Sequence, residues 1–157
     1  MAPPLRFALR SALWLFLGGW VGAWLLFGLV VAPVSFRTLP STELAGMVVS
    51  PVLMVLHLYG AVAGLALGLI AAALGRGSLM LALPLVMAAL CLYSHFGLTA
   101  QISELRELAF GPTGNTEAAV HWGQLHRNSM TLFIAIGIGA LVLLGLHVHA
   151  EGDPVRS

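Results

Sequence analysis

Hydrophobic residues along this chain are gathered in four long blocks. Each block is almost wholly apolar, and short runs with charged residues, glycine or proline separate one block from the next. A helix needs about 20 apolar residues to cross a bilayer core of roughly 30 Å. The pattern therefore predicts one all-α domain over residues 1–157, an integral membrane four-helix bundle. Its helices are antiparallel and up-and-down, with spans at about residues 12–36, 51–74, 79–101 and 127–148.

Proline, glycine and capping residues indicate where these helices bend and end. Pro33 and Pro51 predict kinks in the first and second helices, because proline lacks an N–H and clashes with the preceding turn. Ser41 is a suitable N-cap for the second helix. The tight polar turn at residues 75–78 predicts that the second and third helices are antiparallel neighbours, and the loop at residues 110–115 precedes the fourth helix.

Small residues recur at four-residue spacing in two of the predicted helices. Gly60, Gly64 and Gly68 form one stripe, and Gly18 and Gly22 form a second in the first helix. Such stripes let helix backbones approach closely in a membrane. The sequence predicts that both are helix-packing faces, and it leaves open whether they contact helices of the same chain or of a second copy.

Composition supports a membrane protein and excludes a nucleic-acid-binding one. Hydrophobic residues make up 59% of the chain and charged residues 8%, and the net charge is +1. Soluble domains carry about 25% charged residues. All seven cations are arginine, without a basic patch that could neutralise a phosphate backbone. Cys91 is the single cysteine, so an internal disulfide is excluded.

The arginines are distributed unequally between the two ends of the predicted bundle. Cytoplasmic loops of membrane proteins carry an excess of Lys and Arg. This rule predicts that both termini lie in the cytoplasm. Arg6, Arg10, Arg76 and Arg156 fall on the side of the termini, whereas Arg37, Arg106 and Arg127 fall on the other side with Glu43, Glu104, Glu107 and Glu117.

Three histidines from three different helices are expected at similar depth, near the non-cytoplasmic face. His57, His95 and His126 all fall in or at the edge of the outer third of the bilayer. Neutral imidazole is a common ligand of copper and haem iron, so these residues are candidates for a cofactor or metal cluster. The alternative is that each histidine hydrogen-bonds separately across helices or lies at headgroup level. The sequence leaves both interpretations open.

Two classes of function therefore remain. The spans contain no carboxylate, and the chain shows neither a serine–histidine–acid set nor a glycine-rich phosphate loop. This favours a non-enzymatic membrane protein of unassigned activity that acts through helix packing, partners or lipids. The alternative is a membrane protein that binds haem b or copper through the histidines, as an oxidoreductase would. The expected partners are the lipid bilayer and either a second copy of the chain or another membrane protein.

Several stretches of the chain also resemble a known family. They are residues 19–22 and 31–36 in the first helix, 45–48 in the second and 124–129, with His126 and Ser129, in the fourth. These stretches resemble the four-helix membrane proteins related to transmembrane protein 205, the domain of unknown function 4149. The resemblance implies a bacterial inner-membrane protein without an established activity.

That family is in turn distantly similar to copper-resistance protein D-like membrane proteins and to membrane haem-containing protoporphyrinogen oxidases. The similarity implies histidine ligands arranged on four helices. The first helix of this chain has no histidine, so a ligand there is not carried over.

Overall fold

The computed structural model describes residues 2–112 and 114–152, apart from the side chain of Glu43. Four helices in this part of the chain are long and apolar enough to cross a membrane. They confirm the predicted all-α membrane bundle. Their segments are α1 (Pro3–Leu26), η1 (Phe27–Val31), α2 (Ala32–Thr38), α3 (Thr42–Ala73), α4 (Ser78–Tyr93), η2 (Ser94–Leu98), α5 (Thr99–Phe110) and α6 (Thr116–Gly152).

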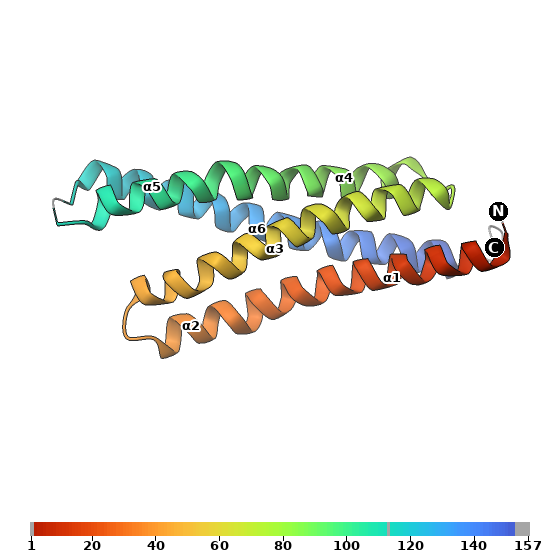
Figure 1. Ribbon diagram of the computed structural model, residues 1–157, viewed down its shortest axis with the longest axis horizontal. Coiled ribbons are helices and arrows are strands. Elements are labelled where there is room, and N and C mark those ends of the chain that lie inside the picture. Colours follow the sequence, from red (N-terminus) through yellow and green to blue (C-terminus); the bar gives the residue numbers. More distant parts are fainter. Residues whose placement is uncertain (1, 113, 153–157) are drawn as a thin grey trace.

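The four spans form an antiparallel bundle in which each helix packs against two neighbours (Figure 1). α1 lies against α3 and α6, and α4 lies against the same two helices. The start of α1 and the end of α6 meet at one end of the molecule, called here the inner end. At the opposite, outer end the bundle separates into two arms: α2 packs on the start of α3, and α5 packs on the start of α6.

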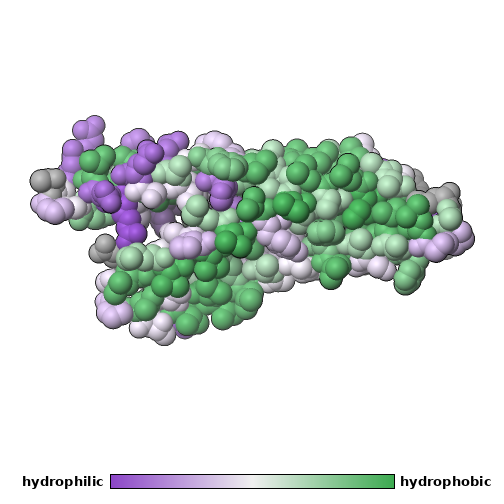
Figure 2. Space-filling model, in the orientation of Figure 1, coloured by the Kyte–Doolittle hydropathy of each residue, from purple (hydrophilic) through white to green (hydrophobic). Residues whose placement is uncertain are grey.

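The outward-facing surface of the bundle is largely apolar. Large hydrophobic side chains are exposed along every span, including Leu15, Leu29, Val55 and Leu69. Figure 2 shows this surface as a nearly continuous green region, with hydrophilic side chains gathered mainly on the arm formed by α5 and the start of α6. A surface of this kind is stable in a bilayer and not in water.

The predicted helix boundaries follow from local hydrogen bonds. The hydroxyl of Ser41 accepts a bond from the N–H of Leu44 at 3.2 Å and so caps α3. Asn115, which the sequence analysis did not single out, accepts a bond from the N–H of Glu117 at 2.8 Å at the start of α6. Each cap satisfies an N–H that has no carbonyl partner one turn earlier.

The turn between α3 and α4 is a Schellman motif. Gly75 has a φ of 65°, a left-handed conformation that glycine adopts without strain. The N–H of Arg76 then donates to the carbonyl of Ala71 at 2.9 Å. This geometry ends α3, directs the Arg76 side chain back towards the bundle, and makes α3 and α4 antiparallel neighbours as predicted.

The first span deviates from regular helix one turn before the predicted kink. Pro33 cannot donate to the carbonyl of Leu29, and its ring crowds that carbonyl. The chain responds by widening into the π-turn η1, which contains Leu29, before α2 begins. In the second span, by contrast, α3 stays helical through Pro51.

The two glycine stripes have different surroundings. A Cβ on Gly64 would lie 2.5 Å from the carbonyl oxygen of Pro84, and one on Gly68 would lie 2.7 Å from the Leu85 side chain. Gly60 faces Cys91 and Trp20 in the same way, so this stripe lies against helices of the same chain. Gly18 and Gly22 have open space around them. A contact between copies there stays a prediction.

Candidate functional site

His57 lies in the core of the bundle, where α1 and α3 pack together. Its side chain is fully buried, and its ring meets the indole of Trp24 edge-on, with ring centres 5.6 Å apart. The carbonyl of Leu53 lies one turn earlier, but neither ring nitrogen makes a hydrogen bond of acceptable geometry within the described chain. A buried polar group without a partner costs about 1–3 kcal/mol. Both nitrogens are therefore available to a proton, a water molecule or a ligand.

His95 approaches His57 from the third span. The two imidazoles are close enough to interact electrostatically. His95 belongs to the π-turn η2, where Thr99 donates its hydroxyl to the carbonyl of Ser94 at 2.9 Å. The Nδ1 atom of His95 and the buried hydroxyl of Ser94 have no hydrogen-bond partner among the described residues. A π-turn changes the direction of the side chains within it, and such turns are frequent at functional sites.

His126, the third predicted ligand, lies apart from this pair. It is exposed, and its ring stacks on that of Trp122, one turn earlier in α6, with centres 5.1 Å apart and planes at 4°. Within residues 2–112 and 114–152, no three His, Cys, Asp or Glu side chains are grouped as a metal site requires. The structure thus leaves His126 apart from His57 and His95, and a site shared by His57 and His95 stays a prediction.

His147 is a buried polar residue that sequence analysis missed. It is fully buried near the inner end of α6, and both of its ring nitrogens lack a partner within the part of the chain described. The sequence held a signal for this burial. Ile136, Ala140 and Leu143 are also fully or almost fully buried, and His147 continues their four–three–four spacing along one helix face.

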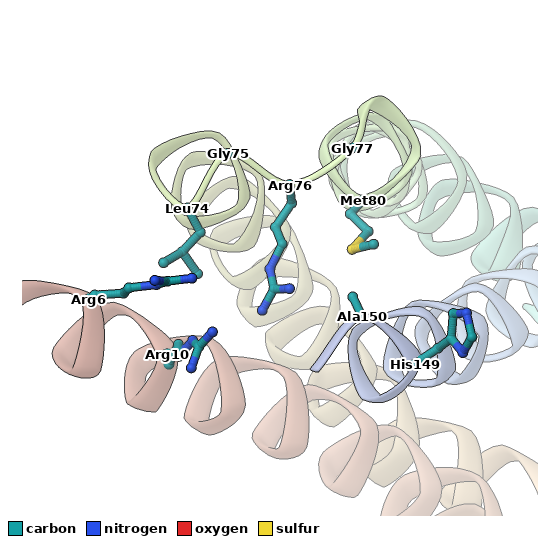
Figure 3. A pocket seen from close by; sticks show the side chains of 9 residues that line it. All are labelled: Arg6, Arg10, Leu74, Gly75, Arg76, Gly77, Met80, His149 and Ala150. Carbon is teal, nitrogen blue, oxygen red and sulfur yellow. The ribbon is translucent and has the colours of Figure 1, made fainter. Parts of the chain in front are cut away.

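The inner end of the bundle holds a polar pocket of about 280 Å³. Arg6 and Arg10 reach it from α1, Arg76 from the α3–α4 turn and His149 from α6 (Figure 3). Glu151 of α6 accepts a hydrogen bond from Arg76 at 2.9 Å and lies 3.9 Å from Arg10. These contacts connect three elements that are far apart in the sequence.

A second hollow is an apolar groove between α1 and α6. It has a volume of about 330 Å³ and is open to the side of the bundle. Trp24 stacks on Phe133, with ring centres 4.5 Å apart, and donates its indole N–H to the carbonyl of Phe133 at 2.9 Å. Gly28 and Gly137 make room for these two rings, because a Cβ on Gly137 would lie 2.9 Å from the Trp24 ring. The other lining residues are aliphatic.

Four membrane-length helices around a core that contains the buried residues His57 and His147 define a multi-pass membrane protein of unassigned function. The chain belongs to the family described as a domain of unknown function, DUF4149, which matches residues 15–110. The matched segment begins within α1, includes Trp24, His57 and His95, and ends with α5, before α6. Comparison with curated proteins and with solved structures finds no match. The further resemblance to transmembrane protein 205 and to copper-resistance proteins stays a prediction.

Proposed function

We propose that this protein is a non-enzymatic membrane protein that binds lipid, with the acyl chain of a phospholipid in the groove between α1 and α6. The observation that carries the proposal is the groove itself, which is apolar, about 330 Å³ in volume and open to the side of the bundle. Ligand pockets in proteins start at about 300 Å³. Within a bilayer, acyl chains are the molecules that surround such an opening.

The rigidity of the groove supports this proposal. Its base is formed by Trp24 and Phe133, which are stacked and joined by a hydrogen bond between two helices. Phe27 packs on Phe133 from the next turn of the first span, with ring centres 5.4 Å apart. A preformed surface costs less to order when a ligand binds than a mobile one. An acyl chain in the groove is therefore expected to exchange more slowly than lipid on the smooth faces of the bundle.

A photocrosslinking experiment tests the groove directly. The protein is reconstituted with phosphatidylcholine that carries a diazirine near the middle of one acyl chain, and crosslinked peptides are mapped by mass spectrometry. We expect the label to concentrate on α1 and α6 at the groove. Leu25→Trp at its rim should lower this labelling several-fold. Val55→Trp is the control, because Val55 is 68% exposed on α3 and lies outside the groove. Uniform labelling of all exposed faces would contradict the proposal.

The second candidate function is binding of haem b or copper by His57 and His95. Both nitrogens of His57 and Nδ1 of His95 are without hydrogen-bond partners in the described chain, and the two residues lie on different spans within electrostatic range of each other. Buried polar atoms are almost always satisfied, so an unsatisfied set calls for a partner. Imidazole nitrogens are suitable donors for either metal. His126 can bind the same metal only if its ring first moves away from the ring of Trp122, on which it stacks.

A visible spectrum with metal analysis on the purified protein tests the second candidate. A haem band or one copper per chain is expected to disappear in His57→Ala and in His95→Ala. His121→Ala is the matched control, since this histidine is exposed on α6, and His126→Ala tests the third predicted ligand. A colourless, metal-free protein in every case would leave lipid binding as the function.

The proposal places the protein in the inner membrane of a bacterium, with both termini in the cytoplasm. The charges at the two ends support this orientation. Arg6, Arg10 and Arg76 lie at the inner end, where Glu151 is the acidic residue among those that the structure describes. Excess arginine is typical of the cytoplasmic side. Association with a second copy or with another membrane protein stays a prediction.

A further inference from the structure

The inner pocket carries more positive charge than the described residues neutralise. Three guanidinium groups, from Arg6, Arg10 and Arg76, converge on it, and Figure 3 shows Arg10 and Arg76 directed towards each other from α1 and from the α3–α4 turn. Glu151 is the carboxylate that pairs with Arg76 and approaches Arg10. Among the described residues, one carboxylate thus faces three guanidinium groups, a balance that favours an anion in the pocket.

Some hydrogen-bond donors in the pocket also lack an acceptor among the described residues. The Nε atoms of Arg10 and Arg76 are buried and have no hydrogen-bond partner in the described part of the chain. The side chain of Arg76 is only 13% exposed, so little water reaches it. Guanidinium groups bind phosphate oxygens through paired N–H donors. One carboxylate accepts only part of the hydrogen bonds that these arginines can donate. A phosphate group, with several acceptor oxygens, would satisfy these donors.

The position of the pocket matches that of a lipid phosphate. It lies among the starts of α1 and α4 and the ends of α3 and α6, at one end of the membrane-spanning segments. Basic pockets between transmembrane helices at the cytoplasmic side bind anionic headgroups. The first N–H groups of α4 open beside Gly77, which caps the helix without a side chain, and they add a favourable dipole.

The pocket and the groove share one face of α1. At roughly 100° per residue, Arg10 and Val21 of the groove point about 20° apart, and Gly28 returns to the direction of Arg10. Along the axis Val21 lies about 16 Å from Arg10, close to half the thickness of a bilayer core. A lipid whose phosphate occupies the pocket can therefore extend an acyl chain to the groove.

We propose that the inner pocket binds a phosphate-type anion, supplied by the headgroup of an anionic phospholipid. This inference extends the proposed lipid binding from an acyl chain to a class of lipid. It rests on that function only for the choice of lipid over free phosphate as the source.

The test measures the increase in melting temperature of the detergent-purified protein with phosphatidylglycerol, with phosphatidylcholine and with inorganic phosphate. Phosphatidylglycerol is expected to stabilise the protein most. Arg6→Gln and Arg10→Gln should each weaken its apparent affinity by about fivefold, from the contribution of one arginine near a lipid surface. Arg127→Gln is the matched control, because Arg127 is an exposed arginine on the opposite part of α6.

Glu151→Gln separates ligand binding from a structural role. It removes the described carboxylate that contacts two of the pocket's arginines, so the apparent affinity for phosphatidylglycerol should rise even if the protein without lipid becomes less stable. Leu25→Trp should lower stabilisation by both lipids and leave the preference for phosphatidylglycerol unchanged. Failure of groove binding and failure of the pocket thus give different results.

Three outcomes decide the inference. A preference for phosphatidylglycerol that depends on Arg6 and Arg10 supports it. Equal stabilisation by inorganic phosphate, with loss of the lipid preference in its presence, supports an anion site and rejects the lipid as its source. No difference between the two lipids, or an equal effect of Arg127→Gln, overturns it.

Discussion

Glu151 connects three parts of the chain through one carboxylate. Its Oε2 atom accepts a bond from the indole N–H of Trp14 at 3.2 Å, and its Oε1 atom accepts one from Arg76 at 2.9 Å. The carboxylate side chain is 27% exposed, so water weakens these contacts only in part. They join the start of α1, the α3–α4 turn and the end of α6, which no other described carboxylate does.

Glu151→Gln is therefore expected to lower the free energy of unfolding by about 1 kcal/mol, the amount typical of a partly exposed ion pair with hydrogen bonds. The loss should appear as a lower melting temperature in detergent without added lipid. Glu104→Gln provides the control, because Glu104 is exposed at the outer end. Equal losses in the two variants would show that Glu151 does not connect the three segments.

At the scale of the element, the close packing of α3 on α4 depends on one glycine more than on the others. A Cβ on Gly64 would meet the backbone carbonyl of Pro84, which cannot move aside as a flexible side chain can. Pro84 has no N–H, so the carbonyl of Met80, four residues earlier in α4, lacks its usual donor. Gly64 of α3 and Pro84 of α4 thus lie against each other where the two helices pack.

Gly64→Ala should destabilise the bundle by about 1–3 kcal/mol, the usual cost of an oversized side chain in a packed interior. Gly22→Ala, at a position with open space, should leave stability unchanged. Thermal unfolding followed by circular dichroism measures both. If Gly22→Ala were the more damaging variant, α1 would contact a partner that this chain alone does not provide.

The sequence predicted some elements well and others not at all, and the difference has physical causes. Long apolar blocks, the Ser41 cap and the turn at Gly75 are local signals, so helix number and order follow from them. The π-turn η2 contains no proline and has no local signal. The burial of His147 and the meeting of Arg10 with Arg76 depend on how α1, α3 and α6 pack, which sequence spacing does not give.

At the scale of the whole molecule, the four spans place the start of α1 and the end of α6 at the same end of the bundle. With the proposed orientation, which places this end in the cytoplasm, a fluorescent reporter that folds only in the cytoplasm should be bright in bacterial cells when fused at the C-terminus, and a C-terminal alkaline phosphatase fusion should be inactive. Both fusions after residue 40, between the first two spans, should give the opposite result. A bright reporter at both positions would contradict the four-span topology.

The unequal ends of the bundle have a mechanical consequence. Glu151 holds α1, α6 and the α3–α4 turn together at the inner end, whereas the arms at the outer end diverge (Figure 1). The contacts of Glu151 therefore form a pivot between the two arms. A rotation of a few degrees at the pivot displaces atoms in proportion to their distance from it, so the tips of the arms move furthest. Changes in membrane thickness or lateral pressure would then change the distance between the two arms.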